Sequence, residues 1–156
     1  ESVPFSRAAE EAGIDAVYIA PPSAAAETLD AVAAASRGYV YAVSRVGVTG
    51  TERASSTVGL AESVERLRAD AAAPVMLGFG ISTPEQVAEA IAAGADGAIS
   101  GSATVKIVER YAPEIMAAAG NNGRGGHEER RHYALGALRS DLVAFTATMK
   151  EATRPH

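Results

Sequence analysis

Residues 78–105 read GFGISTPEQVAEAIAAGADGAISGSATV, and this stretch decides the fold class. Two glycine clusters, Gly78-Phe79-Gly80 and Ser100-Gly101-Ser102, each follow a short apolar run and precede a segment with helical spacing. Glycine lets the backbone approach an anion closely, and the N–H groups at a helix start carry partial positive charge. The stretch therefore predicts two strand–loop–helix units whose loops hold one phosphate. The alternative interpretation is a pair of tight turns without a ligand.

The same alternation of strand and helix runs through the preceding residues. Four apolar runs are predicted to be strands, and the Ala-, Glu- and Arg-rich segments beside them helices. The predicted strands are 16–20, 39–44, 74–77 and 95–100, and the predicted helices are 6–12, 24–35, 58–71 and 84–93. Apolar strands joined by helices indicate a parallel α/β sheet, which is either an open doubly wound sheet or a (β/α)8 barrel.

The tail of the chain favours the barrel. Barrel enzymes commonly bind phosphate with the loops after their last two strands and with the N-terminus of an extra helix, and a helix is predicted at 103–119. A second helix is predicted at 135–152. Residues 120–134 between them contain the run GNNGRGGHEERR, which predicts a mobile insertion before the C-terminal helix. We interpret 1–156 as a single, partial barrel domain.

Composition excludes several classes of function. With 156 residues, 47% of them hydrophobic, the chain can bury a core. Its net charge is −5 and its basic residues form no stripe, so no nucleic-acid partner is expected. There is no cysteine and no apolar run of membrane-spanning length, so we expect no membrane contact and a cytoplasmic location. The three histidines lie near the end of the chain without a carboxylate cluster, and no metal site is expected.

A third loop, residues 45–57 (RVGVTGTERASST), is long for a strand-to-helix connection. It contains Thr49 and Gly50, and it is interpreted either as a lid that adds a backbone N–H from Gly50 to the phosphate or as a surface loop without function. Tyr41 lies near the C-terminal end of the preceding strand. Its phenol is predicted either to contact substrate or to lie in the core with its hydroxyl satisfied.

Three runs together carry a family resemblance. These are GYVYAVSRVGVTG at 38–50, GFGIS at 78–82 and AISGSATVKI at 98–107. The combination resembles the tryptophan synthase alpha subunit. The similarity extends from the APP run at 20–22 to the closing MKEATRP and is interrupted at 120–134.

The resemblance implies a (β/α)8 barrel that cleaves indole-3-glycerol phosphate to indole and glyceraldehyde 3-phosphate, a lyase step of tryptophan biosynthesis. It further implies a partner beta subunit that uses pyridoxal phosphate, in an alpha2-beta2 type complex, with no cofactor in this chain. Family positions that surround the phosphate and glycerol match Gly50, Phe79, Gly80, Gly101 and Ser102. Catalytic positions match Tyr41 and Thr49, and the walls of the indole pocket match Ile19 and Ile99.

The chain departs from the family in its carboxylates. Cleavage needs one acid to protonate the indole ring and one carboxylate to take a proton from the glycerol hydroxyl. The predicted strand ends carry none; Glu52 in the third loop and Asp96 at the start of a strand are the nearest. The family's catalytic Glu and Asp belong to the first half of its barrel, and the four strands here match strands five to eight. We therefore expect a C-terminal half-barrel with C-terminal helices that grips phosphate but is inactive alone.

Three further expectations follow. An open half-barrel exposes two strand edges and an apolar inner face, which predicts self-association. The chain would alternatively be a phosphate-binding module without activity. It would otherwise belong to another sugar-phosphate barrel enzyme, such as an epimerase or a relative of indole-glycerol-phosphate synthase, which would need its own catalytic acid or lysine at a strand end.

Overall fold

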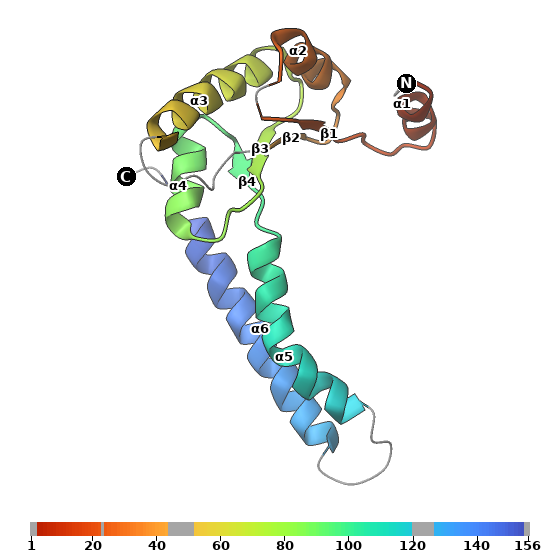
Figure 1. Ribbon diagram of the computed structural model, residues 1–156. Coiled ribbons are helices and arrows are strands. Elements are labelled where there is room, and N and C mark those ends of the chain that lie inside the picture. Colours follow the sequence, from red (N-terminus) through yellow and green to blue (C-terminus); the bar gives the residue numbers. More distant parts are fainter. Residues whose placement is uncertain (1–2, 23, 44–51, 120–126, 155–156) are drawn as a thin grey trace.

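The computed structural model describes residues 3–22, 24–43, 52–119 and 127–154 (Figure 1). In these ranges the chain alternates between helices and short strands, as predicted. The strands are β1 (Tyr18–Ala20), β2 (Val40–Val43), β3 (Val75–Gly78) and β4 (Gly97–Ala98). The helices are α1 (Val3–Glu11), α2 (Ala26–Ala35), α3 (Glu52–Asp70), α4 (Pro84–Ala92), α5 (Ser102–Ala119) and α6 (His127–Glu151).

The strands form one parallel sheet whose spatial order, β1-β2-β3-β4, is the order of the chain. A doubly wound sheet reverses its strand order at a switch point, whereas a barrel adds each strand beside the last. The sequential order over four strands is therefore that of a barrel segment. Strands β1 and β4 are its two edges, since each pairs with a single neighbour in the described sheet.

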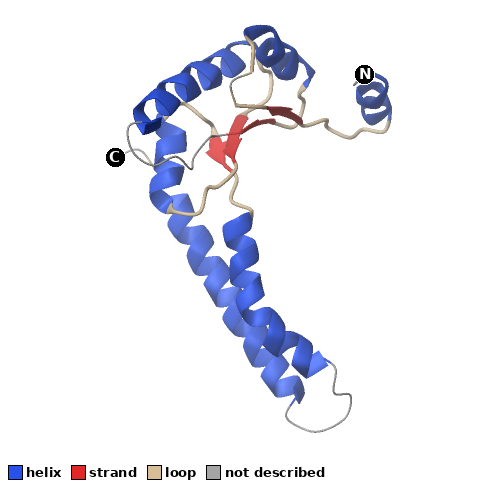
Figure 2. Ribbon diagram, viewed as in Figure 1, coloured by secondary structure: helices blue, strands red, loops and turns tan. Residues whose placement is uncertain are grey.

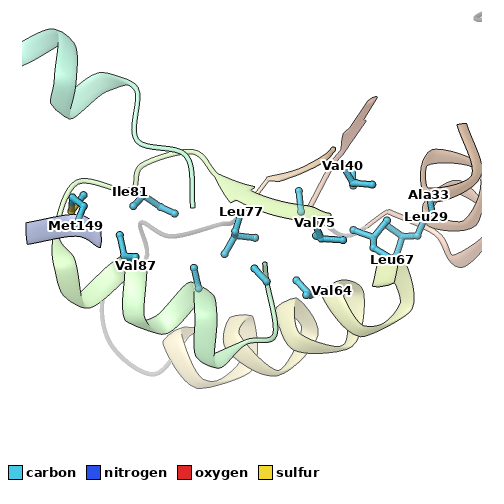
Figure 3. Close-up of a cluster of buried hydrophobic side chains, with 14 residues drawn as sticks. Leu29, Ala33, Val40, Val64, Leu67, Val75, Leu77, Ile81, Val87 and Met149 are labelled. Atoms are coloured by element: carbon cyan, nitrogen blue, oxygen red, sulfur yellow. The ribbon is translucent and has the colours of Figure 1, made fainter. Parts of the chain in front are cut away.

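One face of the sheet is buried under helices and carries the core. Because strand side chains alternate between faces, Val40 and Ala42 share a face with Val75 and Leu77, and all four are buried. Figure 3 shows Val75 and Leu77 directed toward Val64 and Leu67 of α3. Figure 2 shows α2, α3 and α4 arched over this side of the sheet.

The opposite face is the one that lines the inside of a complete barrel. Ile19, Tyr41, Met76 and Gly97 form a row across it, because each is the register partner of the next. Ile19 is 61% exposed, and Tyr41 and Met76 are half-buried. This inner face therefore presents apolar and aromatic side chains that the described elements leave partly uncovered.

Asp96 fixes the start of β3 against β4. Its Oδ2 atom accepts a hydrogen bond from the Val75 N–H at 2.9 Å, and its Oδ1 lies 3.3 Å from an Arg68 nitrogen. Arg68 also donates to the Gly94 carbonyl at 3.1 Å. The carboxylate thus holds the N-terminal end of the sheet to α3, at the opposite end from the glycine clusters.

Helices α5 and α6 form a long antiparallel pair that extends away from the sheet (Figure 1). The Tyr111 hydroxyl donates to Asp141 Oδ2 at 2.7 Å, which ties the two helices together. Only the far end of α6 returns to the core, where Met149 is buried and Phe145 packs beside it. None of the helices in the described ranges combines the length and the apolar character that a membrane span requires.

Two predicted boundaries differ most from the structure, whereas α1, predicted at 6–12, begins at Val3, and β4, predicted at 95–100, is Gly97–Ala98. The predicted insertion at 120–134 overlaps α6, which begins at His127, so residues 127–134 are helical; residues 120–126 lie outside the described ranges. Charged residues suggested a surface loop there, but Glu and Arg are also good helix formers and cover the exposed face of α6. Helix α3 likewise begins at Glu52, six residues before its predicted start at Val58, and shortens the predicted 45–57 loop.

Candidate functional site

The two glycine clusters lie side by side at the C-terminal edge of the sheet. Gly78 is the last residue of β3, and β4 beside it ends at Ala98. The pairing continues one residue further, because the Ile99 N–H donates to the Leu77 carbonyl at 2.8 Å. Neighbouring parallel strands place their following loops together, so the loop before α4 and the loop before α5 share one edge.

A side-chain hydrogen bond joins these two loops. The Ser100 hydroxyl donates to the Ile81 carbonyl at 2.7 Å, across 19 positions of sequence. The Ile81 side chain is 1% exposed and belongs to the core cluster, so its carbonyl is held by a fixed anchor. The sequence pattern places Ser100 in the second glycine cluster but predicts no role for its hydroxyl, and Ser100 lies between two predicted site residues, Ile99 and Gly101.

The first loop turns sharply after β3. Phe79 and Gly80 have φ angles of +77° and +80°, which places both in the left-handed region. That conformation is uncommon for a bulky residue such as Phe and costs conformational energy. Phe79 is also 68% exposed, beside the edge where the loops meet. Strained backbone of this kind clusters at ligand sites, which supports a binding role for the loop.

The N-termini of α4 and α5, which follow the two loops, differ in the side chains that surround them. At α4 the Gln86 side chain accepts from the Ser82 N–H at 2.8 Å and from the Thr83 N–H at 3.1 Å, and Thr83 completes a capping box. The pKa of Glu85 lies below its usual value, because its own backbone N–H and the Thr83 hydroxyl bond to it. These groups fill the α4 N-terminus. The first turn of α5 contains no acidic residue, and its first residue, Ser102, is exposed.

Gly101 stands directly before α5. A Cβ placed on it would meet no heavy atom within 4 Å, and its φ is not in the left-handed region. Neither crowding nor backbone conformation therefore requires glycine here. Glycine is one of the residues favoured at the N-cap position that Gly101 occupies, and it also allows a ligand to approach the backbone closely. An anion at the α5 N-terminus would be such a ligand.

Tyr41 reaches this edge from the inner face of β2. A Cβ built on Gly78 would lie 2.5 Å from Tyr41 Cζ, so the phenol rests directly against the end of β3. Ile19 is its register partner on the same face. Ile99 lies two residues beyond Gly97, which by strand alternation places it on that face as well.

The structure thus brings most of the predicted site together. Phe79, Gly80, Gly101 and Ser102 lie in or beside the two loops, and Tyr41 lies against Gly78, from which the first loop begins. Ile19 is further away, on the edge strand β1. Thr49 and Gly50 lie outside the described residues.

In the part of the chain that is described, the strand ends at this edge carry no acidic residue; the nearby acids Glu27 and Glu85 belong to the first turns of α2 and α4. Ala20 is followed by Pro21, Gly78 by Phe79, and Ala98 by Ile99 and Ser100. Asp96, one of the two predicted nearest acids, lies at the other end of β4 and is engaged with Val75. Glu52 is the first residue of α3. The described residues also contain no group of three or more His, Cys, Asp or Glu side chains arranged to bind a metal ion.

Comparison with known proteins identifies the family. The family model described as tryptophan synthase alpha chain matches residues 1–129. The chain belongs to the tryptophan synthase alpha chain family. Among curated relatives, the tryptophan synthase alpha chain of Corynebacterium glutamicum is 48% identical over 99% of this chain and 51% of its own length. That of Corynebacterium aurimucosum is 57% identical over 99% of this chain and 50% of its own length.

Solved structures of tryptophan synthase have the same fold in the region they share. A Mycobacterium tuberculosis structure aligns with a TM-score of 0.65 at 29% identity over all of this chain and 48% of its own. The a2b2 complex from Pyrococcus furiosus aligns with a TM-score of 0.60 at 26% identity over 92% of this chain and 51% of its own. The chain therefore spans about half the length of the tryptophan synthase alpha chains that it matches. The barrel-type fold class predicted from the sequence is confirmed.

Proposed function

We propose that this chain supplies the phosphate-binding half of a tryptophan synthase alpha barrel, a lyase that cleaves indole-3-glycerol phosphate to indole and glyceraldehyde 3-phosphate. The observation that carries the proposal is the open position at Gly101, in front of an α5 N-terminus without an acid and tied by Ser100 to the Phe79–Gly80 loop. Backbone N–H groups at that helix start would hold the phosphate, and the exposed Ser102 hydroxyl would add a donor.

The inner face would receive the rest of the substrate. Ile19 and Ile99 are apolar and suit an indole ring, and the Tyr41 phenol lies between β1 and the phosphate loops. In this arrangement Tyr41 orients the glycerol end, while Thr49 closes the third loop and Gly50 adds an N–H to the phosphate. The face is uncovered on one side, so the pocket for the indole ring is incomplete in this chain alone.

Proton transfer is the part of the reaction that this chain lacks in our proposal. The cleavage needs an acid for the indole ring carbon and a base for the glycerol hydroxyl. The described strand ends offer neither, and Asp96 is committed to the sheet at the other end. The isolated chain would therefore bind the phosphate end of the substrate without turning it over.

The proposed setting is the cytoplasm, in an alpha2-beta2 type complex with a beta subunit that carries the pyridoxal phosphate. This is supported by the related Pyrococcus furiosus structure, whose description names an a2b2 complex. A Mycobacterium tuberculosis structure is described as tryptophan synthase in an aminoacrylate-bound form. This chain needs no cofactor for its own part, since backbone N–H groups and a hydroxyl suffice to bind phosphate.

Calorimetric titration with glycerol 3-phosphate tests the binding step, with glycerol as the control that lacks phosphate. Gly101→Ala should fold normally but weaken binding about ten- to hundredfold, because a displaced hydrogen bond to a charged group costs about 1.5–3 kcal/mol. Gly136→Ala is the matched control, since a Cβ there also meets nothing but lies on α6, far from the loops. Equal affinity of the Gly101→Ala variant and the unchanged chain would refute the proposed site.

Indole release tests the missing step. The purified chain with indole-3-glycerol phosphate should release no indole, with or without a beta subunit, while a full-length alpha chain releases it under the same conditions. Release at a comparable rate would show that this chain contains its own acid and base, and the assignment of a binding half would be abandoned.

A further inference from the structure

Two serines flank Gly101, and their surroundings differ. Ser102 is exposed at the start of α5. Ser100 is half-buried, and its single O–H donates to the Ile81 carbonyl at 2.7 Å. A hydroxyl has one proton to donate, so Ser100 cannot also donate to a phosphate while this bond is made. Of the two, only Ser102 is available as a direct donor.

The Ser100 hydrogen bond lies beyond the point where backbone hydrogen bonds join β3 and β4. The last backbone bond from β4 to β3 that precedes it joins Ile99 to Leu77 at 2.8 Å. Beyond that point the segment after β3 turns through Phe79 and Gly80 toward α4, and the segment after β4 passes Gly101 into α5. The bond to Ile81 connects the two paths after they leave the sheet.

Both ends of this connection are anchored. Ile81 is fixed by its side chain, which is buried in the core beside Val87 and Met149 (Figure 3). The Ser100 carbonyl accepts from the Thr104 hydroxyl at 3.1 Å, one turn into α5. A movement of the α5 start relative to the first loop would therefore have to break the Ser100–Ile81 bond.

We propose that Ser100 is a positioning residue for the phosphate site: its hydroxyl fixes the α5 N-terminus at the distance from the Phe79–Gly80 loop at which both can contact one phosphate. This inference rests on the proposed phosphate-binding function and deepens it. Donors that are already in place bind an anion more tightly than donors that must be ordered on binding. Ser100 contributes through this arrangement, and Ser102 by direct contact.

The test compares Ser100→Ala and Ser100→Thr in the full chain, with glycerol 3-phosphate and inorganic phosphate as probes. Ser100→Ala should weaken binding about two- to tenfold, the range for one side-chain hydrogen bond, and Ser100→Thr should restore it because the hydroxyl is kept. Ser140→Ala is the matched control. It removes a serine hydroxyl that donates to the Gly136 carbonyl at 3.1 Å within α6, away from the two loops, so it should leave the affinity unchanged.

Amide hydrogen exchange of the ligand-free chain supplies a second readout. Ser100→Ala should accelerate exchange in both loops, at 79–82 and at 101–104, while β2 and the buried half of α3 stay protected. Acceleration in one loop alone would overturn the proposal. If Ser100→Ala destabilises the whole fold, Ser100→Cys takes its place in the same experiment, because cysteine has a similar size and a weaker hydrogen-bond donor.

The two proposals fail in different ways. If the unchanged chain binds neither probe, the phosphate function fails and the role of Ser100 with it. If the unchanged chain binds and Ser100→Ala binds equally well, only the positioning role is overturned.

Discussion

The phenol of Tyr41 rests on Gly78, and no larger residue fits beneath it. A Cβ at Gly78 would lie 2.5 Å from Tyr41 Cζ and 3.1 Å from Cε1. The Tyr41 ring thus occupies the space that a side chain at position 78 would need, at the C-terminal edge of the sheet. The glycine at the end of β3 is explained by the position of the tyrosine.

Gly78→Ala should therefore destabilise the fold by about 1–3 kcal/mol through overpacking against the Tyr41 ring. Removing the ring in the double variant Gly78→Ala/Tyr41→Ala should abolish most of this cost. Urea denaturation of the unchanged chain, the two single variants and the double variant would measure the effect as a coupling free energy. Gly97→Ala is the control: its Cβ would meet the end of the flexible Met76 side chain, which can move aside at lower cost. Additive costs, within about 0.5 kcal/mol, would contradict the packing relationship.

Gly136→Ala should stabilise the chain. Gly136 lies inside α6, where an added methyl group meets nothing. Alanine is favoured over glycine in a helix by about 0.8–1 kcal/mol, so the thermal midpoint should rise. A midpoint that falls would mean that α6 is not helical at this position or that its exposed side is covered by another molecule.

Acid should weaken the connection between α2 and α3. Arg66 donates from Nε to Asp30 Oδ1 at 2.6 Å and from Nη2 to Oδ2 at 2.7 Å, and this pairing lowers the pKa of Asp30. A carboxyl with a lowered pKa in the folded state stabilises the fold above its unfolded pKa, near 3.8, and loses that contribution as the pH falls through the lower folded value.

Thermal midpoints should therefore be lower for Asp30→Asn than for the unchanged chain at neutral pH, and the difference should close as the pH falls below 3.8. Both side chains are exposed, so added salt should reduce the difference as well. Glu11→Gln is the control, because Glu11 pairs with Arg7 within α1 and connects no two elements. A difference that persists in strong acid would rule out the charge of Asp30 as its source.

We propose that the open inner face drives self-association of the isolated chain. Exposed apolar residues lie on β1 and just before it, and β1 itself contains no charged residue, so its edge can pair readily with another strand. These exposed apolar residues are Ile14, Val17 and Ile19. Light scattering after size-exclusion chromatography should show a mass above 15.9 kDa at high concentration.

Ile19→Lys should shift this population toward the monomer, because a charge on the edge strand opposes pairing. Val143→Lys is the matched control, since Val143 on α6 is 61% exposed, as Ile19 is, but lies away from the sheet. A compact monomer at every concentration would contradict the proposal, and an equal response of both variants would place the contact elsewhere.

The alternation of strands and helices was predictable because each strand is a short apolar run between segments of clear helical spacing. The α4 start was predictable from local chemistry, since Thr83 and Gln86 form a capping box and Pro84 stands in the first turn. The starts of α3 and α6 were not, because polar residues in ERASST and HEERR suit a loop and an exposed helix equally well. The direction of α5 and α6, away from the sheet, depends on packing between helices that no local pattern records (Figure 1).

The candidate site was predictable where glycine marks it. Gly80 and Gly101 stand at the two loops as expected, and Asp96 lies at the end of β4 away from them. Ser100 was not predictable, because its role depends on a carbonyl 19 positions earlier in the chain that comes within reach only when β3 and β4 pair. Short-range patterns identify which segments form the site, and tertiary contacts determine how those segments are held.

The Asp96 carboxylate anchors the sheet at one end, while the loops around Gly80 and Gly101 occupy the other. Substitutions among the loop residues can alter ligand preference while the anchored end maintains the strand register. Substitutions around Asp96 would instead be selected for stability alone. Such a division allows ligand preference to change at one end of the sheet without disturbing the strand register at the other.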